Sequence, residues 1–200
     1  SGWSYPSIVG CGENATILHY TVNNEDCHDG EVILIDAGAE YRGYASDITR
    51  SWPISGKFTE AQQEIYSLVL KSQEAAIAAC KVGNPYTAPH DEARRVLAEG
   101  LIELGIISQT LDDALDPMNG ELRNWYMHNT SHWIGLDVHD VGVYKPGGAP
   151  RMLESGMCLT VEPGLYFGAW RPDVDCPERY ANIGIRIEDD VLVTENGPVV

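Results

Sequence analysis

Positive charge is scarce in this sequence. Its 200 residues include 13 lysines and arginines against 30 aspartates and glutamates, for a formal net charge of −17 at pH 7. Binding to nucleic acid needs a basic face, and docking on an anionic membrane needs clusters of basic residues. No apolar run approaches the ~18 residues of a membrane span, and no signal peptide is apparent. The composition therefore argues against nucleic-acid and membrane partners.

Cysteine is also sparse, and its pattern is uninformative. The chain has five cysteines, an odd number, with no CxxC pair. A sulfur-ligated zinc site needs closely paired cysteines, and structural disulfides are typical of oxidising compartments. We therefore expect a cytoplasmic protein whose cysteines are all reduced thiols: Cys11, Cys27, Cys80, Cys158 and Cys176.

The apolar pattern predicts one α+β domain over residues 1–200, in which helices cover one face of an antiparallel sheet. Thr59 and Gln62 form a predicted capping box at the start of the first helix. The expected strands alternate apolar and polar residues or are rich in β-branched residues. The expected helices have apolar residues that recur about every 3.6 positions. The expected strands are 15–22, 31–38, 44–54, 157–167 and 183–195, and the expected helices are 59–83 and 90–105.

Four carboxylates lie at or inside these strands, which is costly unless they are paired or bind a metal. They are Asp36, Asp47, Glu162 and Glu188. For any one of them alone, a carboxylate at a strand end or on the surface is a simpler interpretation than a metal ligand. Together, and near the histidine-rich stretch "MHNTSHWIGLDVH" (127–139), they indicate a metal site, because clustered carboxylates without cations would repel one another. Four carboxylates and one imidazole suit a pair of Mn, Co, Fe or Zn ions, whereas calcium disfavours imidazole.

Four segments in this order resemble the catalytic domain of Xaa-Pro aminopeptidases (aminopeptidase P) in peptidase family M24. They are "DAGAEYRGYASDITRSWP", "MHNTSHWIGLDVHDVG", "LTVEPGLY" and "GIRIEDDVLVT". The resemblance implies the pita-bread (creatinase/aminopeptidase) fold. It also implies a dinuclear metallo-aminopeptidase that cleaves before a proline at the second position of a peptide. The attacking water or hydroxide would bridge two divalent ions, with Mn²⁺ the first choice over Co²⁺, Zn²⁺ or Fe²⁺, and the protein would be a homodimer or homotetramer.

The resemblance also implies the metal ligands. Asp36 would chelate one ion and Asp47 would bridge both. His132 and Glu162 would bind the other ion, with Glu188 as the second bridge. Glu162 would also move the proton from the attacking water toward the leaving amine.

Other residues are implied to serve the substrate. His139 would donate a hydrogen bond to the scissile carbonyl oxygen, and His128 and His19 would orient the substrate. Arg186 matches an arginine of the family that lies beside the bridging Glu188, although a plain ion pair is an alternative for it. His28 and His90 lie in polar contexts, and we expect both to be exposed.

Two departures from the family pattern stand out. Asn129 occupies a position that is usually glycine, and asparagine tolerates unusual backbone angles better than most residues. The chain also looks truncated at its N-terminus and lacks the separate N-terminal domain that members have. Two alternatives to the aminopeptidase remain: a prolidase restricted to Xaa-Pro dipeptides, and a non-catalytic pita-bread module that binds peptides or proteins.

Overall fold

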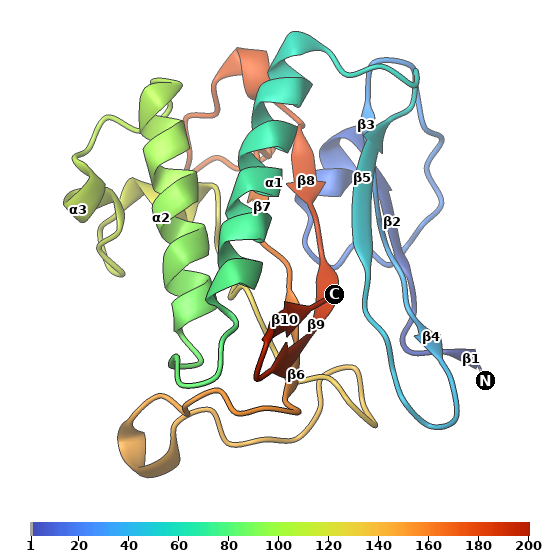
Figure 1. Cartoon of the computed structure of the whole chain (residues 1–200). Coiled ribbons are helices and arrows are strands. Elements are labelled where there is room, and N and C mark those ends of the chain that lie inside the picture. Colours follow the sequence, from blue (N-terminus) through green and yellow to red (C-terminus); the bar gives the residue numbers. More distant parts are fainter. Residues whose placement is uncertain (1) are drawn as a thin grey trace.

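The computed structural model describes residues 2–200, in which strands come first, helices follow and strands return (Figure 1). The strands are β1 (Gly2–Trp3), β2 (Ile8–Cys11), β3 (Val32–Asp36), β4 (Ala39–Glu40), β5 (Thr49–Pro53), β6 (Cys158–Val161), β7 (Gly164–Tyr166), β8 (Gly184–Arg186), β9 (Asp189–Thr194) and β10 (Gly197–Val199). The α-helices are α1 (Glu60–Ala79), α2 (Ala88–Glu103) and α3 (Leu111–Ala114). Short 3₁₀ helices are η1 (Gly12–Thr16), η2 (Glu121–Asn124), η3 (Pro146–Gly148) and η4 (Glu178–Tyr180).

The strands form small antiparallel sheets. β2, β3 and β5 form one sheet with β3 in the middle, and β6, β9 and β10 form another with β9 in the middle. β7 pairs with β8, and β1 pairs with β4. The predicted hairpin between residues 31–38 and 44–54 is confirmed, and its register places Asp36 opposite Thr49.

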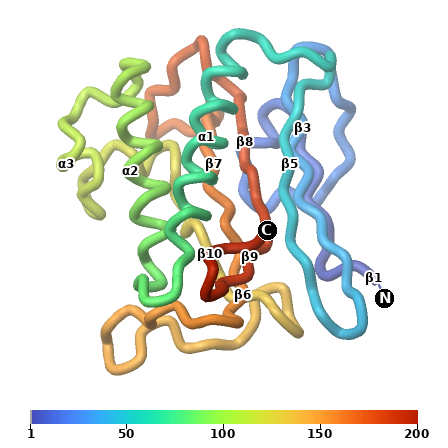
Figure 2. The backbone as a smooth tube through the Cα atoms, viewed as in Figure 1, coloured from blue at the N-terminus to red at the C-terminus, as the bar shows by residue number. Residues whose placement is uncertain are grey.

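The two long helices lie side by side, and α1 packs against β7 and β8 (Figures 1 and 2). The capping box of Thr59 and Gln62 is present at the start of α1, as predicted. Ile65 on α1 and Leu97 on α2 are fully buried in the same core as Ile185 of β8. Burying each such side chain stabilises the fold by about 1.5–3 kcal/mol. The expected α+β arrangement, with helices on one face of antiparallel strands, is therefore confirmed.

The strand predicted over residues 15–22 is wrong. The 3₁₀ helix η1 ends at Thr16, and the chain then runs without a regular element until β3 begins at Val32. A strand needs a free sheet edge with which to pair its backbone groups. β2, and not residues 15–22, pairs with β3 on the side opposite β5, and η1 takes up the start of the predicted strand.

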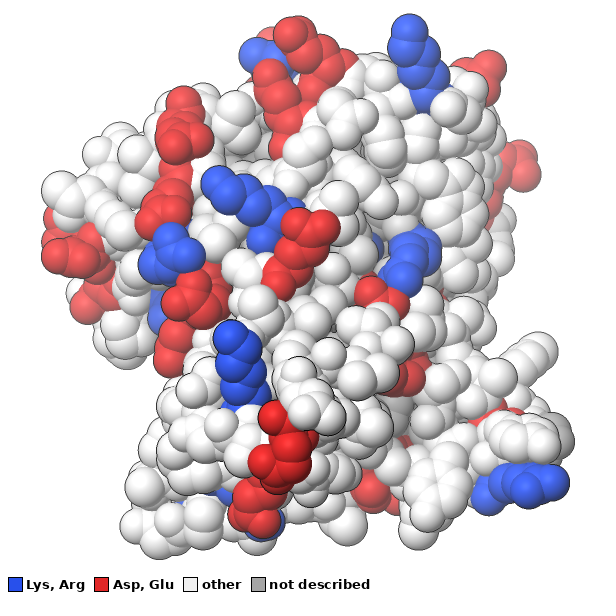
Figure 3. Space-filling view, viewed as in Figure 1, with Lys and Arg blue, Asp and Glu red and all other residues white. Residues whose placement is uncertain are grey.

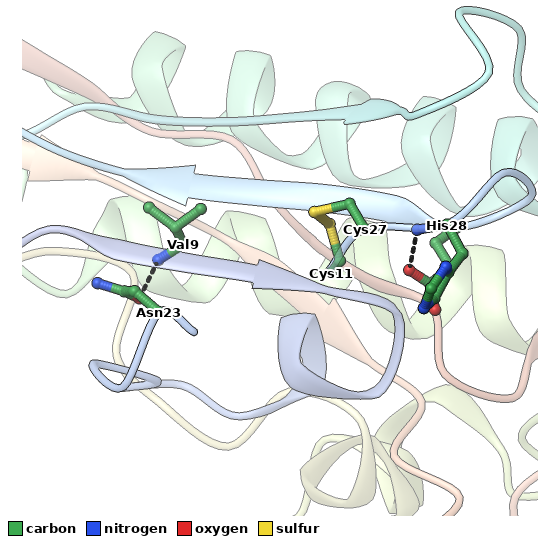
Figure 4. Close-up of a disulfide and its surroundings, with 6 residues drawn as sticks. Val9, Cys11, Asn23, Cys27 and His28 are labelled. Atoms are coloured by element: carbon green, nitrogen blue, oxygen red, sulfur yellow. Dashed lines mark hydrogen bonds between the residues drawn. A yellow bond between two sulfur atoms is a disulfide. The ribbon is translucent and has the colours of Figure 1, made fainter. Parts of the chain in front are cut away.

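The prediction of five reduced cysteines is also wrong. Cys11 and Cys27 form a disulfide with their Cα atoms 5.6 Å apart, inside the range of about 4.4–6.8 Å that disulfides require (Figure 4). The irregular segment after η1 turns back and brings Cys27 beside the end of β2. Sequence spacing does not report this return, because pairing depends on the distance in the folded chain. Cys80, Cys158 and Cys176 are free thiols.

Acidic and basic side chains are interspersed on the face shown in Figure 3, where the described basic residues form no continuous patch. Within residues 2–200, none of the helices combines the length and apolar character that a membrane crossing requires.

Candidate metal centre

All nine predicted site residues line one cavity of about 530 Å³. They are His19, Asp36, Asp47, His128, His132, His139, Glu162, Arg186 and Glu188. The cavity therefore collects side chains from the N-terminal sheet, the histidine-rich stretch and the C-terminal strands. Their roles as ligands or catalytic groups remain predictions.

The hairpin of β3 and β5 supplies the two aspartates. Asp36 is the last residue of β3, and Asp47 lies just before β5 on the returning strand, so both carboxylates lie at the same end of the hairpin. Gly38 allows the close crossing at this end, since a Cβ there would lie 1.7 Å from the Ser46 carbonyl oxygen. The Asp47 backbone N–H donates to Asp190 Oδ2 at 3.1 Å, which ties this end of the hairpin to β9.

His132 and Glu162 come together because the histidine-rich stretch runs beside β6. The Thr160 N–H donates to the His132 carbonyl at 3.0 Å, and the Glu162 N–H donates to the Thr130 carbonyl at 2.8 Å. His132 Nε2 consequently lies 3.4 Å from Glu162 Oε1 and 3.4 Å from Asp47 Oδ2. These three side chains converge although 115 residues of chain separate Asp47 from Glu162.

Glu188 enters the cavity at a break between β8 and β9. A single strand over residues 183–195 is wrong, because the Glu188 N–H donates to the Thr49 carbonyl of β5 at 3.1 Å. The Thr49 hydroxyl in turn donates to Glu188 Oε2 at 2.6 Å. The interruption thus turns a buried glutamate, 1% exposed, toward the aspartates.

Arg186 pairs with Asp36. Its Nη2 donates to Asp36 Oδ2 at 2.7 Å, and its Nε donates to the Thr49 hydroxyl at 3.1 Å. The guanidinium therefore acts on an aspartate of β3 and on the threonine that holds Glu188. The ion pair with Asp36 is the alternative left open for Arg186, and its expected place beside Glu188 in a metal site stays a prediction.

Tyr5 is a cavity residue that sequence reasoning missed. Its hydroxyl forms short hydrogen bonds with Oδ1 of Asp36 and Oδ1 of Asp47. Burial raises the pKa of the Tyr5 hydroxyl, so it stays protonated and remains a donor. The sequence around Tyr5 carries no local signal for this contact, because Tyr5 precedes β2 and reaches the aspartates only after β2 pairs with β3.

The carboxylates of the cavity conflict electrostatically. Burial raises the pKa of Asp36, Glu162 and Glu188, and that of Glu162 reaches about 7. Repulsion from neighbouring carboxylates adds to the shift in both glutamates. Burial would also raise the pKa of Asp47, but hydrogen bonds from His132 and Tyr5 lower it instead. A cluster of this kind is relieved by divalent cations, whose charge favours the ionised carboxylates.

The donor atoms fit such cations. One ligand atom each from Asp47, His132 and Glu188 lie within 4.8 Å of one another. His132 Nδ1 lies 3.0 Å from the Trp133 carbonyl oxygen, which only accepts, so Nδ1 carries a proton. Nε2 faces Asp47 and Glu162 and is the nitrogen that a cation would take in place of its proton. In this arrangement a backbone carbonyl orients an imidazole for metal binding.

Both ring nitrogens of His128 are engaged by the protein. Nδ1 donates to the Asn129 carbonyl at 2.8 Å, and Nε2 lies 2.8 Å from the Tyr166 hydroxyl. That hydroxyl accepts from Arg186 Nη1 at 3.0 Å, so its own hydrogen is donated to Nε2. Burial lowers the pKa of His128 to about 3, which keeps the ring neutral. His128 therefore presents a ring rather than a free donor to the cavity.

The remaining histidines differ in exposure. His139 packs edge-on against His132 with ring centroids 4.3 Å apart, and His19 lies exposed on the irregular segment. His28 is exposed as expected, but the same expectation is wrong for His90. His90 lies in the first turn of α2, and its Nδ1 accepts from the Thr130 N–H at 3.2 Å. Its burial, which the surrounding sequence does not signal, lowers its pKa to about 4.

Comparisons with known proteins agree on one family. A profile of metallopeptidase family M24 matches residues 1–195. The chain is 50% identical over 194 residues to the Xaa-Pro aminopeptidase of Escherichia coli (strain K12), covering 97% of this chain and 43% of that protein. It is 44% identical over 195 residues to Xaa-Pro aminopeptidase 1 of Streptomyces coelicolor, covering 96% and 39%.

Solved structures show the same likeness. Aminopeptidase P from Escherichia coli in its low-pH form superposes with a TM-score of 0.91 at 50% identity, covering 99% of this chain and 44% of that one. The Pseudomonas aeruginosa aminopeptidase PepP gives a TM-score of 0.92 at 43% identity, covering 100% and 44%. The pita-bread fold is confirmed, and the chain spans less than half the length of these relatives.

Proposed function

The chain belongs to metallopeptidase family M24, and we propose that it is the catalytic part of an Xaa-Pro aminopeptidase. In this proposal the protein hydrolyses the bond between an N-terminal residue and a following proline. The observation that carries it is the single cavity that gathers the carboxylates and histidines of the predicted site. The relatives named Xaa-Pro aminopeptidase support the substrate class.

Membership of the family implies divalent metal ions, and the residues to hold them are proposed here. Asp36, Asp47, His132, Glu162 and Glu188 are the proposed ligands of two ions, with Mn²⁺ the first choice. Oxygen-rich ligands with one imidazole suit Mn²⁺. When bound, a pair of divalent cations lowers the pKa of water and polarises a scissile carbonyl.

Glu162 is the proposed carrier of the proton. A general base must lie within reach of the proton that it takes, and Glu162 lines the cavity with its Oε1 3.4 Å from His132 Nε2. Thr160 Oγ1 lies 3.3 Å from Oε1 and donates to it, which orients the carboxylate toward His132. Glu162 can therefore accept a proton from the attacking water and return it to the leaving proline nitrogen.

The histidines have separate proposed roles. His139 lies at the exposed side of the cavity, and burial lowers its pKa, so it is a neutral donor for the oxygen on which negative charge develops. His128 and His19 orient the substrate, with His128 acting through its ring because its nitrogens are already bonded. A proline nitrogen in a peptide bond has no hydrogen to donate, and a ring surface that requires no donor suits it.

The proposal includes an oligomeric state but no cellular location. We propose a homo-oligomer, a dimer or tetramer, on the basis of the family resemblance. The expected cytoplasmic location was argued from five reduced thiols, and the Cys11–Cys27 disulfide removes that support because structural disulfides are rare in reducing compartments.

The test is hydrolysis of an Xaa-Pro-Yaa tripeptide by the full-length protein with added Mn(II). Turnover should fall by at least about 10²-fold in Glu162→Gln, which preserves shape but removes the base. The matched control is Glu74→Gln, which makes the same change at an exposed position of α1. Absence of turnover in the parent, or equal turnover in both variants, would refute the proposal.

The same assay separates the alternatives. Cleavage of an Xaa-Pro dipeptide without the tripeptide would indicate a prolidase. Peptide binding without cleavage, in a protein that retains no divalent ion after dialysis, would indicate a non-catalytic module. The metal content is measured on the same samples.

A further inference from the structure

One wall of the cavity belongs to a segment without regular structure. Residues 17–27, which we call the cavity loop, follow η1 and lead toward β3. Leu18, His19 and Thr21 of this loop line the same cavity as the carboxylates. The side chains of residues 21–27 are all exposed, so the far half of the loop has no core of its own. Its position must therefore be set by a few anchors.

The anchors lie at the two ends of the loop. At its start, the Thr16 hydroxyl accepts from Trp170 Nε1 at 2.9 Å, and Leu18 and Tyr20 pack against a small apolar cluster. At its far half, Asn23 Oδ1 accepts from the Val9 N–H of β2 at 2.9 Å (Figure 4). Asn23 Nδ2 also donates to the Ser7 carbonyl at 2.8 Å. Among residues 2–200, no other hydrogen bond joins the far half to β2.

The disulfide completes the far anchor. Cys11 is the last residue of β2 and is buried, whereas Cys27 is exposed at the end of the loop (Figure 4). The bond closes a covalent ring, and the whole cavity loop lies inside that ring. The exposed hydrogen bonds of Asn23 compete with water, but the covalent link does not.

We propose that the Cys11–Cys27 disulfide positions the substrate-facing wall of the cavity, and that its reduction weakens peptide binding while leaving the chemical step in place. With the bond broken, the loop samples arrangements in which His19 and Thr21 no longer face the substrate. The apparent affinity for the peptide then decreases in proportion to the fraction of molecules whose loop still faces the substrate. The metal-binding strands do not carry the disulfide, so the carboxylates stay where they are.

The reduction is a defined reaction. A water-soluble phosphine attacks one sulfur, breaks the S–S bond and releases the other sulfur as a thiolate. Water then supplies the oxygen of the phosphine oxide and the two protons of the free thiols, so the phosphine loses two electrons and the disulfide gains them. A phosphine is preferred to a dithiol, because thiolates are themselves ligands for divalent metals.

The experiment compares the full-length protein before and after reduction by tris(2-carboxyethyl)phosphine, with Mn(II) and an Xaa-Pro-Yaa tripeptide. Reduction should expose two further thiols in the chain, raise KM about three- to tenfold and change kcat less than twofold. Hydrogen exchange of residues 17–27 should accelerate, while that of α1 stays constant. The Cys11→Ser/Cys27→Ser variant should show the raised KM with or without phosphine, and Cys176→Ser should respond like the parent.

The kinetic readout rests on the proposed function, but hydrogen exchange does not. The proposal is overturned if reduction raises the thiol count by two but changes neither the hydrogen exchange of residues 17–27 nor KM. Five free thiols of this chain before reduction would overturn it as well. Inactivity of both redox states would count against the proposed function, and the exchange of residues 17–27 would then decide the present proposal.

Discussion

Arg186 and Asp36 form a buried ion pair that joins β8 to β3 across 150 residues of sequence. Their side chains are only 4% and 12% exposed, and Nη2 donates to Oδ2 at 2.7 Å. The pair holds Asp36 in place and partly offsets the cost of burying its charge. It also links the hairpin that carries the aspartates to the strand that leads into Glu188.

Replacing Arg186 with methionine should destabilise the protein by about 3–5 kcal/mol, because removal of one partner leaves a buried charge unpaired. Bound divalent metal should decrease too, since Asp36 loses its orienting partner. Urea unfolding and metal analysis measure the two effects. The control is Arg95→Ala on α2, which breaks two exposed ion pairs and should cost less than about 1 kcal/mol. Similar losses in both variants would contradict the role given to Arg186.

His132 and His139 should separate metal binding from turnover, although their rings are in contact. His132→Ala should lower metal affinity by at least about 10–100-fold, because removing a residue that only hydrogen-bonds to a metal ligand already has an effect of that size. His139→Ala should keep its metal and lower kcat by about 10²-fold, as expected for one lost donor to a developing oxyanion. Metal content after dialysis and steady-state kinetics test this, and metal loss in His139→Ala would contradict it.

His90 should make the metal-free protein sensitive to mild acid. Burial lowers its pKa from 6.5 to about 4 in the folded state. Between these values the unfolded chain binds a proton that the folded chain does not, so stability is present above pH 6.5 and is lost as pH falls toward 4. Between pH 7 and pH 5 this contribution is about 2 kcal/mol.

The variant His90→Asn tests this contribution, because the amide oxygen can accept from the Thr130 N–H without titrating. Urea unfolding at pH 7 and pH 5, with chelator present, should show a smaller loss in the variant than in the parent. Equal losses would show that His90 does not carry the acid sensitivity.

Gly38 should not tolerate alanine. The added Cβ would lie 1.7 Å from the Ser46 carbonyl oxygen, so the hairpin must open near Asp36 and Asp47. Destabilisation of about 1–3 kcal/mol or more is expected from such overpacking, together with loss of bound metal. Thermal unfolding and metal analysis measure both. Gly2→Ala, where nothing lies within 4 Å of the new Cβ, should leave both unchanged.

The residues of the candidate site could be read from the sequence, but their contacts could not. Acids inside apolar strands and a histidine-rich stretch are visible in the chain itself, and the resemblance assigned their roles. Asp36 as the partner of Arg186 and Tyr5 between the aspartates were not visible. Such contacts depend on which strands pair, and a linear pattern does not report that.

The sequence by itself determined the local structure and the donor types. The capping box of Thr59, the apolar stripes of both long helices and the hairpin after β3 depend on residues a few positions apart, so their patterns are legible. Only the tertiary structure decided that β2, and not residues 15–22, pairs with β3 and that Cys27 meets Cys11. It also decided that both nitrogens of His128 are already bonded. These outcomes depend on which distant parts of the chain the fold brings together. The backbone and side-chain groups that compete for each partner come from those distant parts, so a local pattern does not reveal them.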